Sequence, residues 1–250
     1  MDKLRYINVG HTDGKVESAL WEFPNLMEKQ QPTLIVRQPL KDELGCLGNQ
    51  PLADLVNVDQ LGNTDICRFN IGDSPGMLHT SSAIHCHLVY PSNSKQWIER
   101  TIKATIFKTL KEFGIDCEES RNDIFVNHDG KNKKIFGSII TTYSDWLIIG
   151  FTLTFDINYD LANKIYNFDS EKFVEKGDIT DLRDISVGLY ELNPTLDSNA
   201  LIDNFVQKLA TRLELVIEES SLTTLESTQL YSLADTLDEK SWTEEGICPQ

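Results

Sequence analysis

The chain has 250 residues, of which 40% are hydrophobic and 25% are charged, a composition typical of a globular protein with a sizeable core. Its formal net charge of −16 disfavours nucleic acid as a partner, because phosphate binding needs clustered lysine and arginine. No apolar run is long enough to span a bilayer, and the first residues lack the pattern of a signal or transit peptide. We therefore expect no membrane partner and a cytoplasmic location, or a mitochondrial one if the source is eukaryotic.

The cysteines indicate the redox compartment, and the basic residues indicate where an anionic ligand would bind. The five cysteines are scattered and form no C-x-x-C pair: Cys46, Cys67, Cys86, Cys117 and Cys248. This pattern predicts free thiols in a reducing compartment. Basic residues are concentrated between Lys95 and Lys134, whereas Lys240 is the only one after Glu214. An anionic small ligand is therefore expected near the middle of the chain.

The N-terminal part of the chain alternates predicted strands with short helices. Strands are expected at residues 4–9, 33–37, 46–47, 66–69 and 83–90. Helices are expected at residues 16–28, where Pro24 must break or kink the helix, and at residues 51–59. Residues 70–76 are rich in turn formers and are predicted to be a loop that could surround a ligand.

The remainder of the chain contains the strongest helical pattern. From residue 93 to Gly114, Ile98, Ile102, Ile106 and Leu110 recur on one helical face. Further strands are expected at residues 122–126, 133–138, 146–149 and 151–155, and further helices at 160–166, 170–175, 199–213 and 223–238. Strands clustered around two long helices predict an α+β fold, in one domain that covers residues 1–250.

The predicted hairpin over residues 122–138 contains the first candidate site. Lys134 lies at its base, close to Gly137, where the absence of a side chain allows a ligand to approach the backbone. A lysine in this position can serve as a fixed cation for an anionic substrate. The alternative is a solvated lysine in an ordinary charged turn, which the residue pattern alone favours because charged turns are the norm.

Three histidines form a second candidate cluster. His85 and His87 share one face of a predicted strand, and His79 precedes them. Zinc sites need three or four ligands with a supporting shell, and the sequence shows no such set, which favours ordinary strand histidines. Cys86 could be a nucleophile beside a base, but a thiol in an apolar strand is more typical of the core.

Gly72 and Gly76 form a third candidate, because their backbone N–H groups could contact a phosphate. The start of a helix does not follow them, as it would in a nucleotide-binding loop of the Walker type. No ordered Ser, His and Asp set is visible either. Residue patterns alone therefore predict a soluble α+β domain with an anion site near Lys134.

A resemblance to a known family extends this interpretation. The run Asn122-Asp123-Ile124, a turn, and then Lys134-Ile135-Phe136-Gly137-Ser138 resembles the core motif of the lipoate–protein ligase and biotin–protein ligase superfamily. The likeness continues through residues 149–156, 160–165, 173–176 and 184–189, and covers about residues 97–249. It implies a mixed sheet packed with helices, as in class II synthetases, and no C-terminal accessory domain.

The glycine-rich loop of that family is altered in this sequence. Active lipoate ligases carry an arginine, a run of glycines and then a histidine before the strand that precedes the long helix. Arg68 and His79 match this pattern, and Gly72 matches it approximately, but Asp73 and Pro75 interrupt the glycine run. Side chains there crowd the approach to an adenylate, and a proline removes a backbone donor.

The resemblance implies a role for each matching residue. Lys134 is the implied catalytic residue, and Asp123 is the implied ligand of Mg²⁺. The residues implied to bind substrate or adenylate are Arg68, Gly72, Gly76, His79, Asn122, Asp123, Gly137 and Ser138. The implied cofactors are ATP and Mg²⁺, the small-molecule acyl substrate is lipoate or lipoyl-AMP, and the acceptor is a lysine of a lipoyl domain.

Three functions follow from this resemblance. The first is a lipoate–protein ligase or lipoyltransferase that forms or uses an acyl-adenylate. The second is a catalytically impaired member that acts as a binding or scaffold protein, which the altered loop favours. The third is a biotin–protein ligase, although residues 160–189 look more like the lipoate branch.

Overall fold

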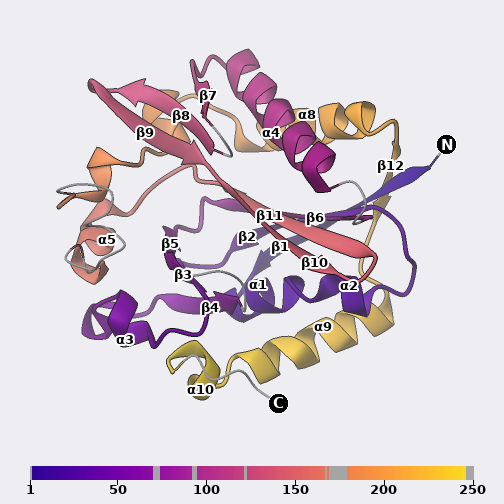
Figure 1. Ribbon diagram of the computed structural model, residues 1–250, viewed down its shortest axis with the longest axis horizontal. Coiled ribbons are helices and arrows are strands. Elements are labelled where there is room, and N and C mark those ends of the chain that lie inside the picture. Colours follow the sequence, from indigo (N-terminus) through magenta and orange to yellow (C-terminus); the bar gives the residue numbers. More distant parts are fainter. Residues whose placement is uncertain are drawn as a thin grey trace.

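The structure, a computed structural model, describes residues 2–69, 74–91, 95–120, 123–166, 168 and 179–245. Its central sheet has six strands in the order β10-β11-β6-β2-β1-β12 (Figure 1). Their bounds are β1 (Lys3–Thr12), β2 (Thr33–Pro39), β6 (Ile84–Pro91), β10 (Ser138–Tyr143), β11 (Trp146–Leu153) and β12 (Val216–Ser220). Strand β1 pairs in parallel with β2 and β12, and the other pairs are antiparallel, so the sheet is mixed.

Helices cover both faces of this sheet. The α-helices of the described residues, including those that lie beside the sheet, are α1 (Gly14–Leu20), α2 (Phe23–Leu26), α3 (Leu52–Leu55), α4 (Lys95–Glu112), α5 (Tyr159–Ile165), α7 (Leu189–Leu192), α8 (Ser198–Arg212), α9 (Thr224–Leu237) and α10 (Lys240–Thr243). Figure 1 shows α4 and α8 on one face and α1, α2 and α9 on the other. Successive strand residues point to opposite faces, so Leu34 packs in the core under α4 and α8 while Ile35 packs under α1 and α9.

Local sequence signals fix the ends of these helices. The side chain of Asp197 accepts hydrogen bonds from two backbone N–H groups at the start of α8. Helix α9 begins with a capping box, in which Thr223 and Glu226 each accept a hydrogen bond from the other's backbone N–H. Caps of this kind satisfy donors that the first turn of a helix leaves unpaired.

Two smaller sheets flank the central one. The first has the order β4-β3-β5, with strands β3 (Glu43–Leu47), β4 (Asp65–Phe69) and β5 (Ser74–His79). The second has the order β7-β8-β9, with strands β7 (Glu118–Ser120), β8 (Asp123–His128) and β9 (Lys131–Phe136). The β3 sheet packs with α3 and α5 in a separate apolar cluster, and the β8–β9 hairpin packs against α4.

The predicted α+β class is confirmed, and Pro24 does separate two helices, α1 and α2. The single helix predicted at residues 51–59 is interrupted after α3, because Val56 is extended and pairs with Tyr166, and a short 3-10 helix follows at Val58–Gln60. The loop predicted through residue 76 is wrong for residues 74–76, which belong to β5 and pair with β3. The helix predicted at residues 170–175 lies outside the described residues.

Two further predictions concern the state of the cysteines and the presence of membrane-spanning helices. The four cysteines in the described residues, Cys46, Cys67, Cys86 and Cys117, are buried free thiols, as predicted. Burial raises the pKa of the Cys86 thiol, with a smaller contribution from the charge of Glu17, which agrees with an inert core residue. Within the described residues, no helix is both long enough and apolar enough to cross a membrane.

Candidate functional site

The hairpin of β8 and β9 has the tight turn that its sequence predicts. His128 pairs with Lys131, so Asp129 and Gly130 form a two-residue loop. Their φ angles are 54° and 74°, as a type I′ turn requires, and asparagine, aspartate and glycine tolerate that conformation best. This turn sets the register of the strand that carries Lys134.

A β-bulge then orients Lys134. Ile124 pairs with Phe136 but Phe125 pairs with Lys134, so Ile135 is an extra residue on β9. Bulges commonly re-aim a side chain next to a functional site. Here Phe136 is buried while Lys134 keeps 35% of its side chain exposed.

Lys134, Asp123 and Gly137 lie in direct contact. The Nζ of Lys134 is 2.8 Å from Oδ1 of Asp123, whose side chain is 32% exposed. A Cβ atom placed on Gly137 would lie 2.6 Å from that Nζ and 3.1 Å from the same carboxylate oxygen. The end of the lysine side chain therefore lies against the Gly137 backbone, in the space that a Cβ atom would occupy. The result is an accessible ammonium paired with Asp123.

A neighbouring segment supports β9 from its other edge. The backbone N–H of Lys134 donates to the carbonyl of Ile185 at 2.8 Å. Glu191 holds this segment, because its Oε1 accepts from the Tyr159 hydroxyl at 2.6 Å and from the Gly188 N–H at 3.0 Å. Burial and this hydrogen bond raise the pKa of the Tyr159 hydroxyl, so it stays protonated as a donor. Sequence reasoning missed this support.

A polar pocket of about 400 Å³ lies beside that segment. It is lined by Asp42, Thr80, Ser81, Ser82, Asp156, Ile157, Asn158, Tyr159, Asp160 and Arg183. The guanidinium of Arg183 lies over the Tyr159 ring at 4.6 Å and 3.4 Å from Asp160. The pocket is therefore connected to the Lys134 strand through Tyr159, which also donates to the carbonyl of Ser186.

The other predicted site residues do not all lie beside Lys134. Ser138 begins β10 directly after Gly137, and Gly76 lies in β5. Asn122 and Gly72 lie outside the described residues. Within the part of the chain that the structure describes, no three His, Cys, Asp or Glu side chains are arranged to hold a metal ion.

Arg68 is the predicted site residue whose placement differs most from a ligand-binding role. It is 1% exposed, and its guanidinium donates to the backbone carbonyls of Gly48, Gln50 and Thr243 at 2.8–3.2 Å. It also lies 5.8 Å from the centroid of the Trp242 ring. Arg68 thus joins β4 to α10, and its donors already have acceptors.

His79 is also buried, against a network of charged side chains beneath it. Its ring packs edge-on against His85 with centroids 4.6 Å apart. Arg37 donates to Glu17 at 2.9 Å and to both oxygens of Glu43 at 3.1 and 2.7 Å. His85 lies 3.5 Å from Glu17 and 3.0 Å from Glu43, the second contact being an ion pair without hydrogen-bond geometry.

This buried network balances its own charge. Burial alone would lower the pKa of His85, but Glu17 and Glu43 outweigh it and raise the pKa to about 9. Burial alone would raise the pKa of Glu43, but His85 and Arg37 outweigh it and lower the pKa. Two carboxylates thus face two cations. In contrast, burial and the charge on His85 lower the pKa of His79 to about 3, so His79 is neutral.

One signal in the sequence could have revealed this network. Glu17 and Arg37 occupy positions where the surrounding apolar pattern predicts burial, and buried charges are almost always paired. His87 belongs to the same cluster, because its Nε2 lies 3.0 Å from Glu17. The interpretation of His85 and His87 as ordinary strand residues therefore missed their partners.

Comparison with known proteins places this geometry in a family. Residues 77–214 match the family described as the lipoyl protein ligase A/B catalytic domain. No curated protein matches the chain by sequence. The fold is similar to that of a bipartite lipoate protein ligase from Thermoplasma acidophilum, studied with its E2 lipoyl domain, with a TM-score of 0.82 and 13% identity over 100% of this chain and 99% of the other.

Two further solved structures share the fold. A lipoate-protein ligase A bound with ATP gives a TM-score of 0.78 and 14% identity, covering 99% of this chain and 100% of the other. The P. falciparum protein LipL1 in complex with lipoate gives a TM-score of 0.72 and 15% identity. The match covers 100% of this chain and 75% of the other. At these identities the structures establish the fold, and the family match covers more than half of the sequence. The chain belongs to the lipoyl protein ligase A/B catalytic-domain family.

Proposed function

We propose that the chain transfers a lipoyl or octanoyl group, through an acyl-adenylate, to a lysine of an acceptor lipoyl domain. One observation carries the proposal: the Lys134 ammonium is held 2.8 Å from Asp123 across the bare backbone of Gly137. Family membership supports the reaction class. Neighbours in the fold, described with ATP, with lipoate and with an E2 lipoyl domain, support the substrates.

The proposed reaction has two steps. A carboxylate oxygen of the acid attacks the α-phosphorus of ATP, and pyrophosphate leaves. The ε-amine of the acceptor lysine then attacks the acyl carbonyl carbon, loses a proton, and AMP leaves. Negative charge shifts between carboxylate and phosphate oxygens in both steps, so a fixed ammonium at Lys134 lowers each barrier electrostatically. Transfer from preformed lipoyl-AMP needs only the second step.

Asp123 is the residue that fits a magnesium ion arriving with ATP. Mg²⁺ in nucleotide sites is held by one or two carboxylates together with substrate phosphates and water. Asp123 offers one accessible carboxylate, and Asn122 and Ser138 beside the motif complete the proposed contacts to the adenylate. When bound, the ion would neutralise phosphate charge. The proposal assigns no adenylate contact to Arg68, because its donors are occupied.

The acceptor and the compartment belong to the same proposal. The partner is a lipoyl domain, and the second substrate is a small acyl molecule. The buried free thiols of the described residues support a reducing compartment, for which we propose the cytoplasm.

Replacement of Lys134 tests this function. We expect Lys134→Ala to lower lipoate-dependent ATP–pyrophosphate exchange, and transfer from synthetic lipoyl-AMP to a purified lipoyl domain, by about 10²–10³-fold. Lys131→Ala is the matched control, since Lys131 is an exposed lysine of the same hairpin whose ion pair with Asp184 lies on the surface. Wild-type protein that catalyses neither reaction would refute the proposal.

A second function, binding without catalysis, is favoured by Arg68. The arginine that matches the family's loop donates to backbone carbonyls here, so it is not available to contact an adenylate. Lipoic acid and synthetic lipoyl-AMP discriminate the two functions, because a ligand that binds only the folded state raises the melting temperature. An increase that Lys134→Ala abolishes supports the ligase, and no increase with either compound supports the binding protein.

A further inference from the structure

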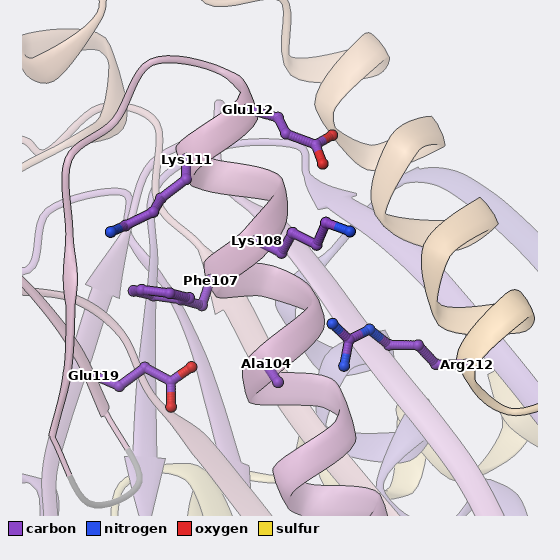
Figure 2. Close-up of a pocket in the computed structure, with 7 residues that line it drawn as sticks. All are labelled: Ala104, Phe107, Lys108, Lys111, Glu112, Glu119 and Arg212. Atoms are coloured by element: carbon purple, nitrogen blue, oxygen red, sulfur yellow. The ribbon is translucent and has the colours of Figure 1, made fainter.

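The outer side of α4 and α8 carries a groove lined by basic side chains. We call it the basic groove; it has a volume of about 470 Å³ and is lined by Ala104, Phe107, Lys108, Lys111, Glu112, Glu119 and Arg212. Figure 2 shows Lys108 and Arg212 extending into the space between the two helices, while Phe107 and Lys111 lie on the side of β7. Ala104 has a small side chain, which leaves the groove open at its centre.

The two carboxylates that line the basic groove are already paired with lysines outside it. Glu112 accepts from the Lys208 ammonium at 2.5 Å, and this hydrogen bond is the main reason that the pKa of Glu112 is lowered. Glu119 lies 3.7 Å from the ammonium of Lys103. Lysines beside the groove therefore neutralise its acids, and the cations within it keep their charge available.

Those remaining cations have weak or no acidic partners. Lys111 lies 3.9 Å from Asp116, a fully exposed carboxylate, and 4.8 Å above the Phe107 ring. Lys108 and Arg212 are exposed, and neither has an ion pair within 4.0 Å among the residues that the structure describes. Two positive side chains thus face the space between α4 and α8, and a third lies on the β7 side of α4 (Figure 2), in a chain with a net charge of −16.

We propose that the basic groove docks a short carboxylate-rich segment of a partner protein. Complementary charge directs an acidic segment to this groove, because the rest of the acidic surface repels it. The Phe107 ring and Ala104 offer apolar contact to the methylene groups of glutamate side chains. A polynucleotide fits less well, because its many phosphates would extend beyond the three cations onto acidic surface.

This docking surface is separate from the candidate catalytic site. Glu119 at the edge of the groove lies on β7, which pairs with β8, whereas Lys134 lies on β9, on the far side of β8. The proposal therefore does not depend on catalysis by Lys134, and each can fail without the other.

A charge reversal with a matched control tests the proposal. The probe is a fluorescein-labelled peptide of ten glutamates, and its binding is measured by fluorescence anisotropy at about 0.1 M salt. For the double variant Lys108→Glu/Arg212→Glu we expect Kd to rise about tenfold or more. The control Lys29→Glu/Lys164→Glu changes two exposed lysines elsewhere and lowers the net charge equally, and we expect its Kd to rise less than about twofold.

Several results would overturn the proposal. One is equal weakening by the groove and control variants while both keep the wild-type circular dichroism spectrum. Another is tighter binding of a ten-nucleotide single-stranded DNA than of the peptide, which would assign the groove to nucleic acid. A third is self-association in sedimentation that only the groove variant abolishes, which would assign the groove to a second copy of the chain.

Discussion

Raising the pH from 7 to 8 should destabilise this protein through the buried network of Glu17, Arg37, Glu43 and His85. Folding raises the pKa of His85 from its ordinary value of 6.5 to about 9, because two buried carboxylates face it. A raised pKa stabilises the folded state fully below the unfolded value, and the contribution is lost as the pH rises towards the folded value. Between pH 7 and 8 this linkage removes about 1 kcal/mol from the free energy of unfolding.

The neighbours of His85 do not cancel this effect. The pKa values of Glu17 and Glu43 are both lowered, so these carboxyls stay ionised across this interval. The pKa of His79 is about 3, so His79 stays neutral in the folded protein. The buried thiols add a loss of only about a few tenths of a kcal/mol, since thiols of the unfolded chain titrate mainly above pH 8.

Urea unfolding of the wild type and of His85→Gln provides the assay. With a slope of about 3 kcal/mol/M, the wild-type midpoint should fall by about 0.4 M between pH 7 and 8. His85→Gln removes the titrating cation, so the variant should be less stable at pH 7, by about 3 kcal/mol, and nearly independent of pH over this interval. A variant that keeps the wild-type pH dependence would refute this account of the network.

Two further substitutions probe the fold. Gly150→Ala should lower the free energy of unfolding by about 2 kcal/mol in the same urea assay, because the alanine Cβ would lie 2.3 Å from the ring of Trp21. An unchanged urea midpoint would show that the ring moves freely. Arg68→Met should cost about 3 kcal/mol, because the buried carbonyls of Gly48 and Thr243 lose their donor. A stable Arg68→Met variant that has lost only ligand binding would contradict the structural role of Arg68.

Local features of the fold followed from the sequence because short-range physics determines them. The apolar spacing of α4, the break at Pro24 and the Asp129-Gly130 turn each depend on neighbouring residues. The contact between Lys134 and Gly137 was predictable for the same reason, since three positions separate them in one hairpin. Asp123 joins them through the β8–β9 pairing that this turn sets.

Features that depend on contacts between residues far apart in the chain could not be predicted from the sequence. The buried network forms only where one helix and three strands from two sheets converge, which brings together Glu17, Arg37, Glu43 and His85. No short segment of sequence determines how these strands are aligned with one another. Strand β7 was not predicted because its three residues are all polar. Strand β12 was not predicted because its two apolar residues stand in an acidic stretch, which gives no alternating strand pattern. The occupied donors of Arg68 depend on α10, far along the chain, so its motif position alone suggested a ligand contact.

The buried network also bears on where this protein could be divided. The family match begins at residue 77, so it contains His85 but not Glu17, Arg37 or Glu43. A fragment of residues 77–214 would lack the two carboxylates that keep His85 charged, and strand β6 would lose its pairing with β2. We therefore expect that the stretch matched by the family model does not fold alone, and that residues 1–76 are needed to complete its sheet and its buried network.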